Sequence, residues 1–191
     1  MDRLLAAGGA VVAAVLLIAG VLLTWAHGYV HDQVHGQLAA QKIYFPADGS
    51  PSLIALPPAD RAAMEQYAGQ QLVTGAQART WADHYIAVHL KDMAGGQTYA
   101  QLSAKSLADP KNTQLAGLVQ TEFRGETLRG LLLNAYAFDT MGNLALIGAI
   151  VAYVGAALMA VLAALGFVHA RRVHVPTPPA STPSAGETVN V

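Results

Sequence analysis

The chain has 191 residues, of which 53% are hydrophobic and 12% are charged, with a formal net charge of −1 and no cysteine. The charged fraction is about half of the roughly 25% found in soluble domains, which argues against an ordinary cytosolic enzyme. The net charge provides no basic face for nucleic acid, and the lack of cysteine excludes disulfides, thiolate nucleophiles and cysteine-ligated metals.

Two long uncharged runs, residues 4–26 and 144–168, dominate the sequence. At about 1.5 Å of rise per residue, either run is long enough as a helix to cross the roughly 30 Å hydrocarbon layer of a membrane. Backbone polar groups in lipid must be satisfied within the segment, so both runs are predicted to be transmembrane helices. A cleaved signal peptide is the alternative for the first run, but its apolar core exceeds the roughly 7–15 residues of such a signal.

The two predicted spans imply a short cytoplasmic N-terminus (residues 1–3), an extracytoplasmic segment (27–143) and a cytoplasmic tail (169–191). Basic residues flank the first span and follow the second, which under the positive-inside rule places both termini in the cytoplasm of a cell-membrane protein. These residues are Arg3, Arg171 and Arg172. The tail is rich in Pro, Ser and Thr and has no apolar periodicity, so we expect it to be disordered.

The segment between the spans is predicted to be mostly helical, beginning with an outward extension of the first span. Val30, Val34 and Leu38 repeat every four residues, which is typical of one face of a helix, and turn-forming residues follow Ile43. A short second helix is expected over residues 60–68. No stretch shows sustained apolar and polar alternation, so any extended structure should be short.

Two later helices in this segment carry start signals. Thr74 is predicted to cap a helix that carries Trp81 and Tyr85 on one face and ends at a pair of glycines, Gly95 and Gly96. After that pair, the sequence Thr-Tyr-Ala-Gln matches the capping-box pattern of a further helix.

The last helix is expected to begin with Asp109 as its N-cap and Pro110 at its first position. No breaker stronger than glycine interrupts it before the second span, so one continuous helix is predicted. Its expected apolar face consists of Leu115, Leu118, Val119, Phe123 and Leu128. The predicted fold class is therefore all-α: a transmembrane helical hairpin of two spans with a small helical extracytoplasmic domain inserted between them.

Small residues recur at four-residue intervals in both predicted spans. Helix association in lipid depends on close backbone approach, which this spacing allows. The stripes are predicted either to pack the two spans on each other or to form an assembly surface for a second copy or another membrane protein. The candidate packing residues are Ala6, Ala10, Ala14, Gly148, Ala152, Ala156, Ala160 and Ala164.

Three histidines, His27, His31 and His35, stand four residues apart just after the first span. Residues at this spacing share a helix face, so the three imidazoles are candidates for holding a divalent metal ion. They are also candidates for sensing pH near the membrane surface. The third interpretation is a simple polar flank of the extended helix.

Charged residues ahead of the second span are expected to lie outside the membrane. Asp139 is predicted at the outer interface, because residues 144–168 already cross the bilayer. A charged face is also expected, on which ion pairs contribute only about a few tenths of a kcal/mol; it consists of Glu122, Arg124, Glu126 and Arg129.

The sequence carries no pattern that favours catalysis. His84 and His89 with Asp83 suggest a two-histidine, one-carboxylate iron site, but five residues of helix turn the two rings about 140° apart. No nucleotide loop, nucleophile elbow or H-E-x-x-H motif occurs. We therefore expect a protein that is not an enzyme and has no cofactor.

Three stretches of the sequence are distinctive: residues 37–48 (QLAAQKIYFPAD), 76–90 (AQARTWADHYIAVHL) and 95–103 (GGQTYAQLS). They resemble a family of small actinobacterial two-span membrane proteins. The resemblance covers most of residues 4–172 and implies the two-span fold, but it transfers no functional residue. Members of this family often carry an automatic label of aromatic ring-opening dioxygenase, which the histidine spacing does not support.

The function expected from the sequence is a non-enzymatic accessory or scaffold subunit of a membrane complex. Its expected partners are the lipid bilayer and either a second copy or another membrane protein, with no nucleic acid. The alternative hypothesis is a metal- or pH-responsive membrane sensor that uses His27, His31 and His35. An extracytoplasmic enzyme ranks third.

Overall fold

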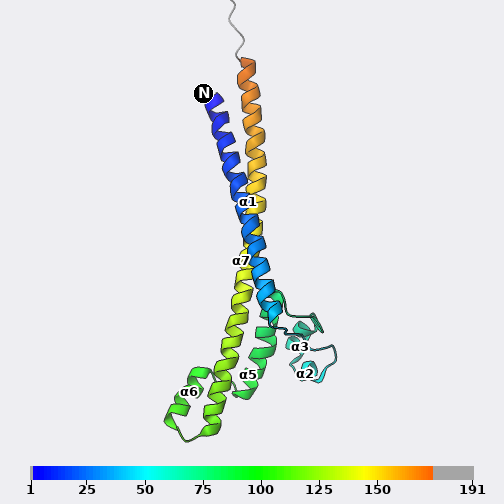
Figure 1. Cartoon of the computed structure of the whole chain (residues 1–191), viewed down its shortest axis with the longest axis vertical. Coiled ribbons are helices and arrows are strands. Elements are labelled where there is room, and N and C mark those ends of the chain that lie inside the picture. The colour runs from blue at the N-terminus through cyan, green and yellow to red at the C-terminus, as the bar shows by residue number, and fades with distance from the viewer. Residues whose placement is uncertain (1, 174–191) are drawn as a thin grey trace, which may run out of the picture. The chain divides into compact units, whose positions relative to one another are not determined.

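The computed structural model describes residues 2–173, so most of the predicted tail lies outside the described part. The expected all-α fold is confirmed there: two long apolar helices pack together, with short helices between them in the sequence (Figure 1). The helices are α1 (Asp2–Ala40), α2 (Pro51–Ile54), α3 (Pro58–Glu65), α4 (Gly75–Trp81), η1 (Ala82–Ile86), α5 (Ala87–Met93), α6 (Tyr99–Ala108) and α7 (Thr113–Val173).

The described chain divides into two compact units. The first unit contains residues 2–19 and 152–173, and the second contains residues 20–151. Helices α1 and α7, with 39 and 61 residues, each run through both units without a break. Both helices are long and apolar enough to cross a membrane, and most large side chains of their apolar stretches are exposed.

In the first unit, α1 and α7 pack through small side chains. A Cβ atom built on Gly9 would lie 3.5 Å from the Cβ of Ala163, and one built on Gly166 would lie 3.1 Å from the Cβ of Ala6. The two backbones therefore approach closely, as small interface residues permit. The buried alanines of this unit are Ala6, Ala13, Ala152, Ala156, Ala163 and Ala170.

Most of these buried positions follow a seven-residue repeat, and of the predicted four-residue stripes only Ala6, Ala152 and Ala156 are buried. Ala156, Ala163 and Ala170 stand seven apart on α7, as Ala6 and Ala13 do on α1. Seven residues nearly complete two helical turns, whereas a four-residue step drifts by about 40° each time and leaves the interface. The other predicted stripe residues are accordingly exposed or half-buried: Ala10, Ala14, Ala160 and Ala164 are exposed, and Gly148 is half-buried.

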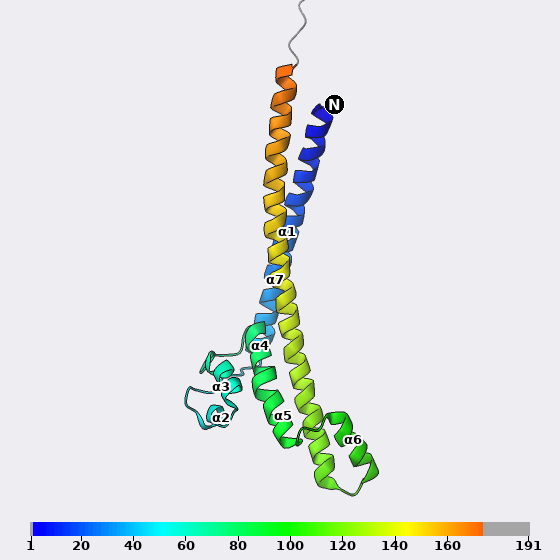
Figure 2. The same ribbon diagram turned by 180° about the vertical axis from the view of Figure 1, so that it is seen from behind.

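The core of the second unit lies where the short helices meet the end of α1 and the first half of α7 (Figure 2). Leu53, Met64 and Leu72 are fully buried there. The ring centroid of Phe45 lies 5.1 Å from that of Trp81 in an edge-on arrangement and 5.2 Å from that of Tyr67. This aromatic cluster fixes the chain that follows α1 against α3 and α4.

The predicted ends of the early helices agree with the structure to within a few residues. Helix α1 ends at Ala40, and Lys42 then adopts a left-handed conformation with φ of 54°. Residues after this turn form one antiparallel bridge, between Tyr44 and Gln71. The second short helix, α3, starts two residues earlier than expected because Pro58 occupies its first turn.

Both predicted helix caps of the middle segment are confirmed. The hydroxyl oxygens of Thr74 and Thr98 accept hydrogen bonds from the backbone amides of Gln77 and Gln101, and each glutamine side chain accepts one from its threonine amide. Gly95 adopts a positive φ of 59° after α5, as the expected glycine stop requires.

The predicted start of the last helix is wrong. Asp109 ends α6, with ψ of 74°, and α7 begins only at Thr113. Asn112 is the residue that caps α7, because its side-chain oxygen accepts a hydrogen bond of 3.0 Å from the amide of Leu115. Once started, α7 continues to Val173, which confirms the predicted continuity into the second apolar run.

The predicted apolar face of α7 is only partly confirmed, because Leu115, Leu118 and Val119 are half-buried but the later positions differ. Phe123 and Leu128 are exposed, whereas Glu122 and Leu132 are buried. Gly125 determines which face of α7 is buried. A Cβ there would lie 2.9 Å from a Cδ atom of Leu90, so the absence of a side chain lets α5 pack closely at this point. The close approach of α5 over a glycine places the neighbouring glutamate inside.

A π-helical turn, η1, joins α4 to α5 and was not expected from the sequence. Its wider turn shifts the following helix face relative to an uninterrupted α-helix. Trp81, Tyr85 and His89 still form a continuous row, with successive ring centroids 4.7 and 4.4 Å apart. Met93, four residues after His89, is half exposed.

Candidate functional site

The predicted histidine row reaches α7 through two of its members. Nδ1 of His27 lies 2.9 Å from the carbonyl oxygen of Gly142, and Nδ1 of His31 lies 3.8 Å from Oδ1 of Asp139. The rings of His27 and His31 are stacked, with centroids 6.1 Å apart. His35 is exposed and has no partner in common with the other two. The row therefore joins α1 to α7 instead of converging on one point.

Asp139 is the most confined residue of this group. Its side chain is 16% exposed, and it packs against the first residue of α4, Gly75. A Cβ on Gly75 would lie 2.8 Å from Oδ2 of Asp139. The side chain of Asp139 thus connects α1, α4 and α7. Its expected position at the outer interface, just before the second span, did not predict this role.

The described side chains do not favour metal binding at these histidines. Within residues 2–173, no three His, Asp or Glu side chains are arranged to hold one metal ion. One ring nitrogen of His27 is also engaged by a backbone carbonyl. Metal binding by His27, His31 and His35 stays a prediction without a converging ligand set.

The acidic and histidine residues of η1 and α5 form separate structural pairs. Nδ1 of His84 lies 2.8 Å from Oδ1 of Asp60, and Nδ1 of His89 lies 2.7 Å from the carbonyl oxygen of Tyr85. Asp83 instead binds Arg129 of α7, with an N–O distance of 3.1 Å. Each group has a different partner, so these residues tie helices together and leave no shared centre.

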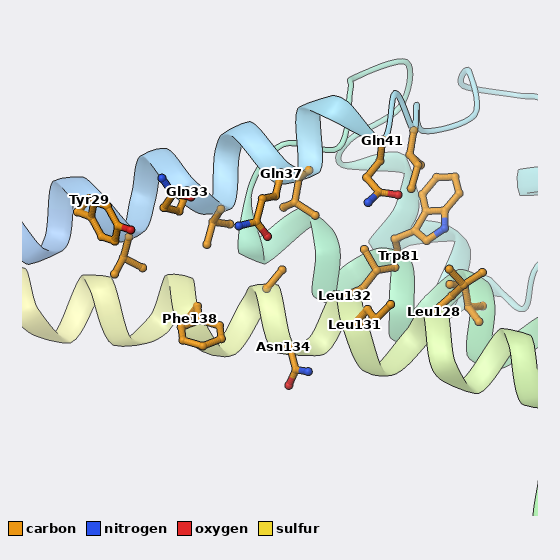
Figure 3. Close-up of a pocket in the computed structure, with 16 residues that line it drawn as sticks. Tyr29, Gln33, Gln37, Gln41, Trp81, Leu128, Leu131, Leu132, Asn134 and Phe138 are labelled. Atoms are coloured by element: carbon orange, nitrogen blue, oxygen red, sulfur yellow. The ribbon is translucent and has the colours of Figure 1, made fainter.

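An apolar groove with a volume of about 570 Å³ lies between α1 and α7 in the second unit (Figure 3). Leu128, Leu131 and Phe138 of α7 form one wall, and each is more than half exposed. Trp81 closes one end (Figure 3). This groove was not predicted from the sequence, in which only Leu128 of these three α7 residues was expected on an apolar face of the helix.

A row of amides forms the opposite rim of the groove. Gln33 and Gln37 on α1 and Gln41 in the turn just after it stand four residues apart, and Figure 3 shows Gln37 and Gln41 pointing towards α7. Every residue that lines the groove is uncharged. The site therefore suits an apolar surface that also carries hydrogen-bonding groups, and it offers no nucleophile or acid–base pair.

The groove directly adjoins the apolar stretches of both long helices. On α1 its lining begins at Tyr29, three residues after the first predicted span ends, and on α7 it ends at Phe138, six residues before the second begins. Trp25 and Tyr29 stack at this level with ring centroids 5.6 Å apart, and both are exposed. Exposed aromatic rings at this level are typical of a membrane–water interface.

The comparisons with known proteins add no functional assignment. No family model, curated protein or solved structure matches the chain.

Proposed function

We propose that this chain is a two-span integral membrane protein of the cell membrane that acts as a non-enzymatic accessory subunit. In this proposal both termini are cytoplasmic, and residues 27–143 form the extracytoplasmic domain. The groove beside α1 and α7 holds an apolar helix of a partner membrane protein at the outer surface of the bilayer. The observation that carries the proposal is this uncharged, exposed groove next to two lipid-compatible helices.

The chemistry of the groove supports a helical partner. Amphipathic helices bind in grooves through apolar anchors, which the exposed side chains of Leu131 and Phe138 can contact. The amides of Gln33, Gln37 and Gln41 can satisfy polar groups on the same helix. An exposed apolar patch of this kind is uncommon on a protein that has no partner, which favours an interaction role.

Leu131→Glu is expected to reduce the capture of the partner by about tenfold or more, because a carboxylate would be placed in an uncharged contact. The measurement is affinity purification of the tagged full chain from native membranes in mild detergent, with quantification of the copurified proteins. Leu131 is 60% exposed, so the substitution leaves the fold intact, and circular dichroism checks this.

Leu107→Glu is the matched control for this experiment. Leu107 is 81% exposed on α6 and does not line the groove, so the same change there should leave capture unaltered. Partner recovery that is equal for both variants, or that survives Leu131→Glu unchanged, contradicts the groove as the docking site.

A membrane sensor based on His27, His31 and His35 is the second candidate function. The 3.8 Å separation of His31 from Asp139 favours a response to protons over a response to metal, because a protonated imidazole would be attracted to the carboxylate. The capture experiment separates the two functions, since such a sensor does not depend on Leu131.

A further inference from the structure

A different hollow, with a volume of about 500 Å³, lies in the second unit between α5, the start of α6 and α7. Its volume is within the range of sites that hold small organic molecules. Two carboxylates of α7 and the turn between α5 and α6 form its walls. The lining residues that matter here are Leu90, Lys91, Gly96, Tyr99, Glu122 and Glu126.

Glu122 is the unusual residue of this hollow. It is 3% exposed, and its Oε2 atom is buried without a hydrogen-bond partner among residues 2–173. Burial, and next the charge of Glu126, raise the pKa of the Glu122 carboxyl above its ordinary value. A buried carboxylate without a partner is costly, so its position requires an explanation other than solvation of a helix surface.

The nearby polar groups of the turn are already engaged with one another. Thr98 and Gln101 satisfy each other through the capping box of α6. The side-chain nitrogen of Gln97 donates to the carbonyl oxygen of Ala94 at 3.2 Å, and the side-chain oxygen of Gln97 accepts a hydrogen bond from Lys105. None of these hydrogen bonds reaches Glu122.

Arg129, seven residues after Glu122 on the same face of α7, also uses both of its terminal nitrogens elsewhere. Arg129 donates through one terminal nitrogen to Asp83 at 3.1 Å and through the other to Glu126 at 3.4 Å. The salt bridges of the described residues do not include Glu122. The hollow thus has an unneutralised carboxylate in its wall.

We propose that this hollow binds a small organic cation that carries a primary ammonium group, with the carboxylate of Glu122 as its counter-ion. An ammonium group supplies hydrogen-bond donors to this carboxylate, and the charge pair offsets the cost of burying it. The ring of Tyr99 provides an aromatic wall for the same ligand. An organic cation fits better than a metal ion, because no three His, Asp or Glu side chains converge within residues 2–173.

Benzylammonium is the probe for this site, and benzyl alcohol is its uncharged match in size. Binding is measured by titration calorimetry on the full chain in nanodiscs of phosphatidylcholine, whose surface has no net charge. We expect saturable binding of benzylammonium and a loss of about tenfold or more in affinity for Glu122→Gln, which removes the charge-assisted hydrogen bond. Benzyl alcohol should not show saturable binding.

Glu65→Gln is the control for the charge change, because Glu65 is exposed on α3 and outside the hollow. It should leave the affinity for benzylammonium unchanged. Equal affinities of Glu122→Gln and the wild-type chain would overturn the proposal, as would wild-type binding of benzyl alcohol at the same affinity or no saturable binding of benzylammonium.

The pH dependence of binding provides a readout on the unaltered chain. The ammonium ion binds the ionised carboxylate, and the raised pKa of Glu122 keeps part of it protonated at acid pH. Wild-type affinity for benzylammonium should therefore increase as the pH rises through that pKa. Glu126 and Lys91 also line the site, and Arg129 pairs with Glu126. The contribution of Glu122 is therefore the difference between the pH profiles of the wild-type chain and Glu122→Gln. A flat wild-type profile would contradict the role of this carboxylate.

Discussion

Ala163→Leu is expected to separate the ends of α1 and α7 in the first unit. Ala163 is buried, and its Cβ lies only 3.5 Å from the place that a Cβ on Gly9 would occupy. A leucine cannot fit at this spacing, so the helices must move towards the separation of about 8–10 Å that larger side chains impose. Overpacking of this kind costs about 1–3 kcal/mol.

The separation can be measured as the distance distribution between spin labels at Leu4 and Val168, which are both exposed. Ala163→Leu should give a longer and broader distribution than the otherwise unaltered chain. Ala164→Leu is the matched control, because Ala164 is exposed and leucine there should leave the distribution unchanged. Equal effects of the two substitutions would mean that the buried alanines spaced seven residues apart do not hold the two helices together.

Gly75→Ala is expected to destabilise the second unit by about 2 kcal/mol, which is typical of overpacking in a confined site. The added Cβ would lie 2.8 Å from Oδ2 and 2.9 Å from Cγ of Asp139. The closest contact is with Cβ of Asp139, which does not move when the side chain changes rotamer, so a rotamer change does not relieve the clash. The substitution should also disturb the approach of His31 to Asp139, since all three residues meet at one place.

Gly36→Ala is the control for this substitution. Gly36 lies within α1 and has no atom within 4 Å of the added Cβ. Replacing a helical glycine with alanine at such a site should stabilise the fold by about 0.5–1 kcal/mol. Thermal unfolding of both variants, followed by circular dichroism in the same detergent, tests the pair. A Gly75→Ala variant as stable as the wild-type chain would contradict the close packing of α4 on α7.

The features that could be predicted from the sequence depend on local information. The lengths of the two apolar runs determine their helices, and the capping residues Thr74 and Thr98 act within one turn of the chain. The start of α7 shows the limit of this approach. Asp109 and Asn112 are both good N-cap residues, and the choice between them depends on where α6 ends.

The features that could not be predicted depend on tertiary contacts. The charge pattern around Glu122 is that of a solvated helix face, and only the approach of Leu90 over Gly125 places this glutamate inside. Likewise, Leu128 was expected on the apolar face of α7, but it lines an open groove instead. Both outcomes follow from the rotation of one long helix relative to its neighbours.

The most direct test of the two-span arrangement is the accessibility of single cysteines in intact cells, since the chain has no cysteine of its own. The variants are Ala47→Cys in the proposed outer domain, Leu158→Cys in the second span and Arg172→Cys after it, each treated with a membrane-impermeant maleimide. The account predicts labelling of Ala47→Cys in intact cells, labelling of Arg172→Cys only after permeabilisation, and none of Leu158→Cys. Labelling of Arg172→Cys in intact cells, or protection of Ala47→Cys there, would contradict the arrangement.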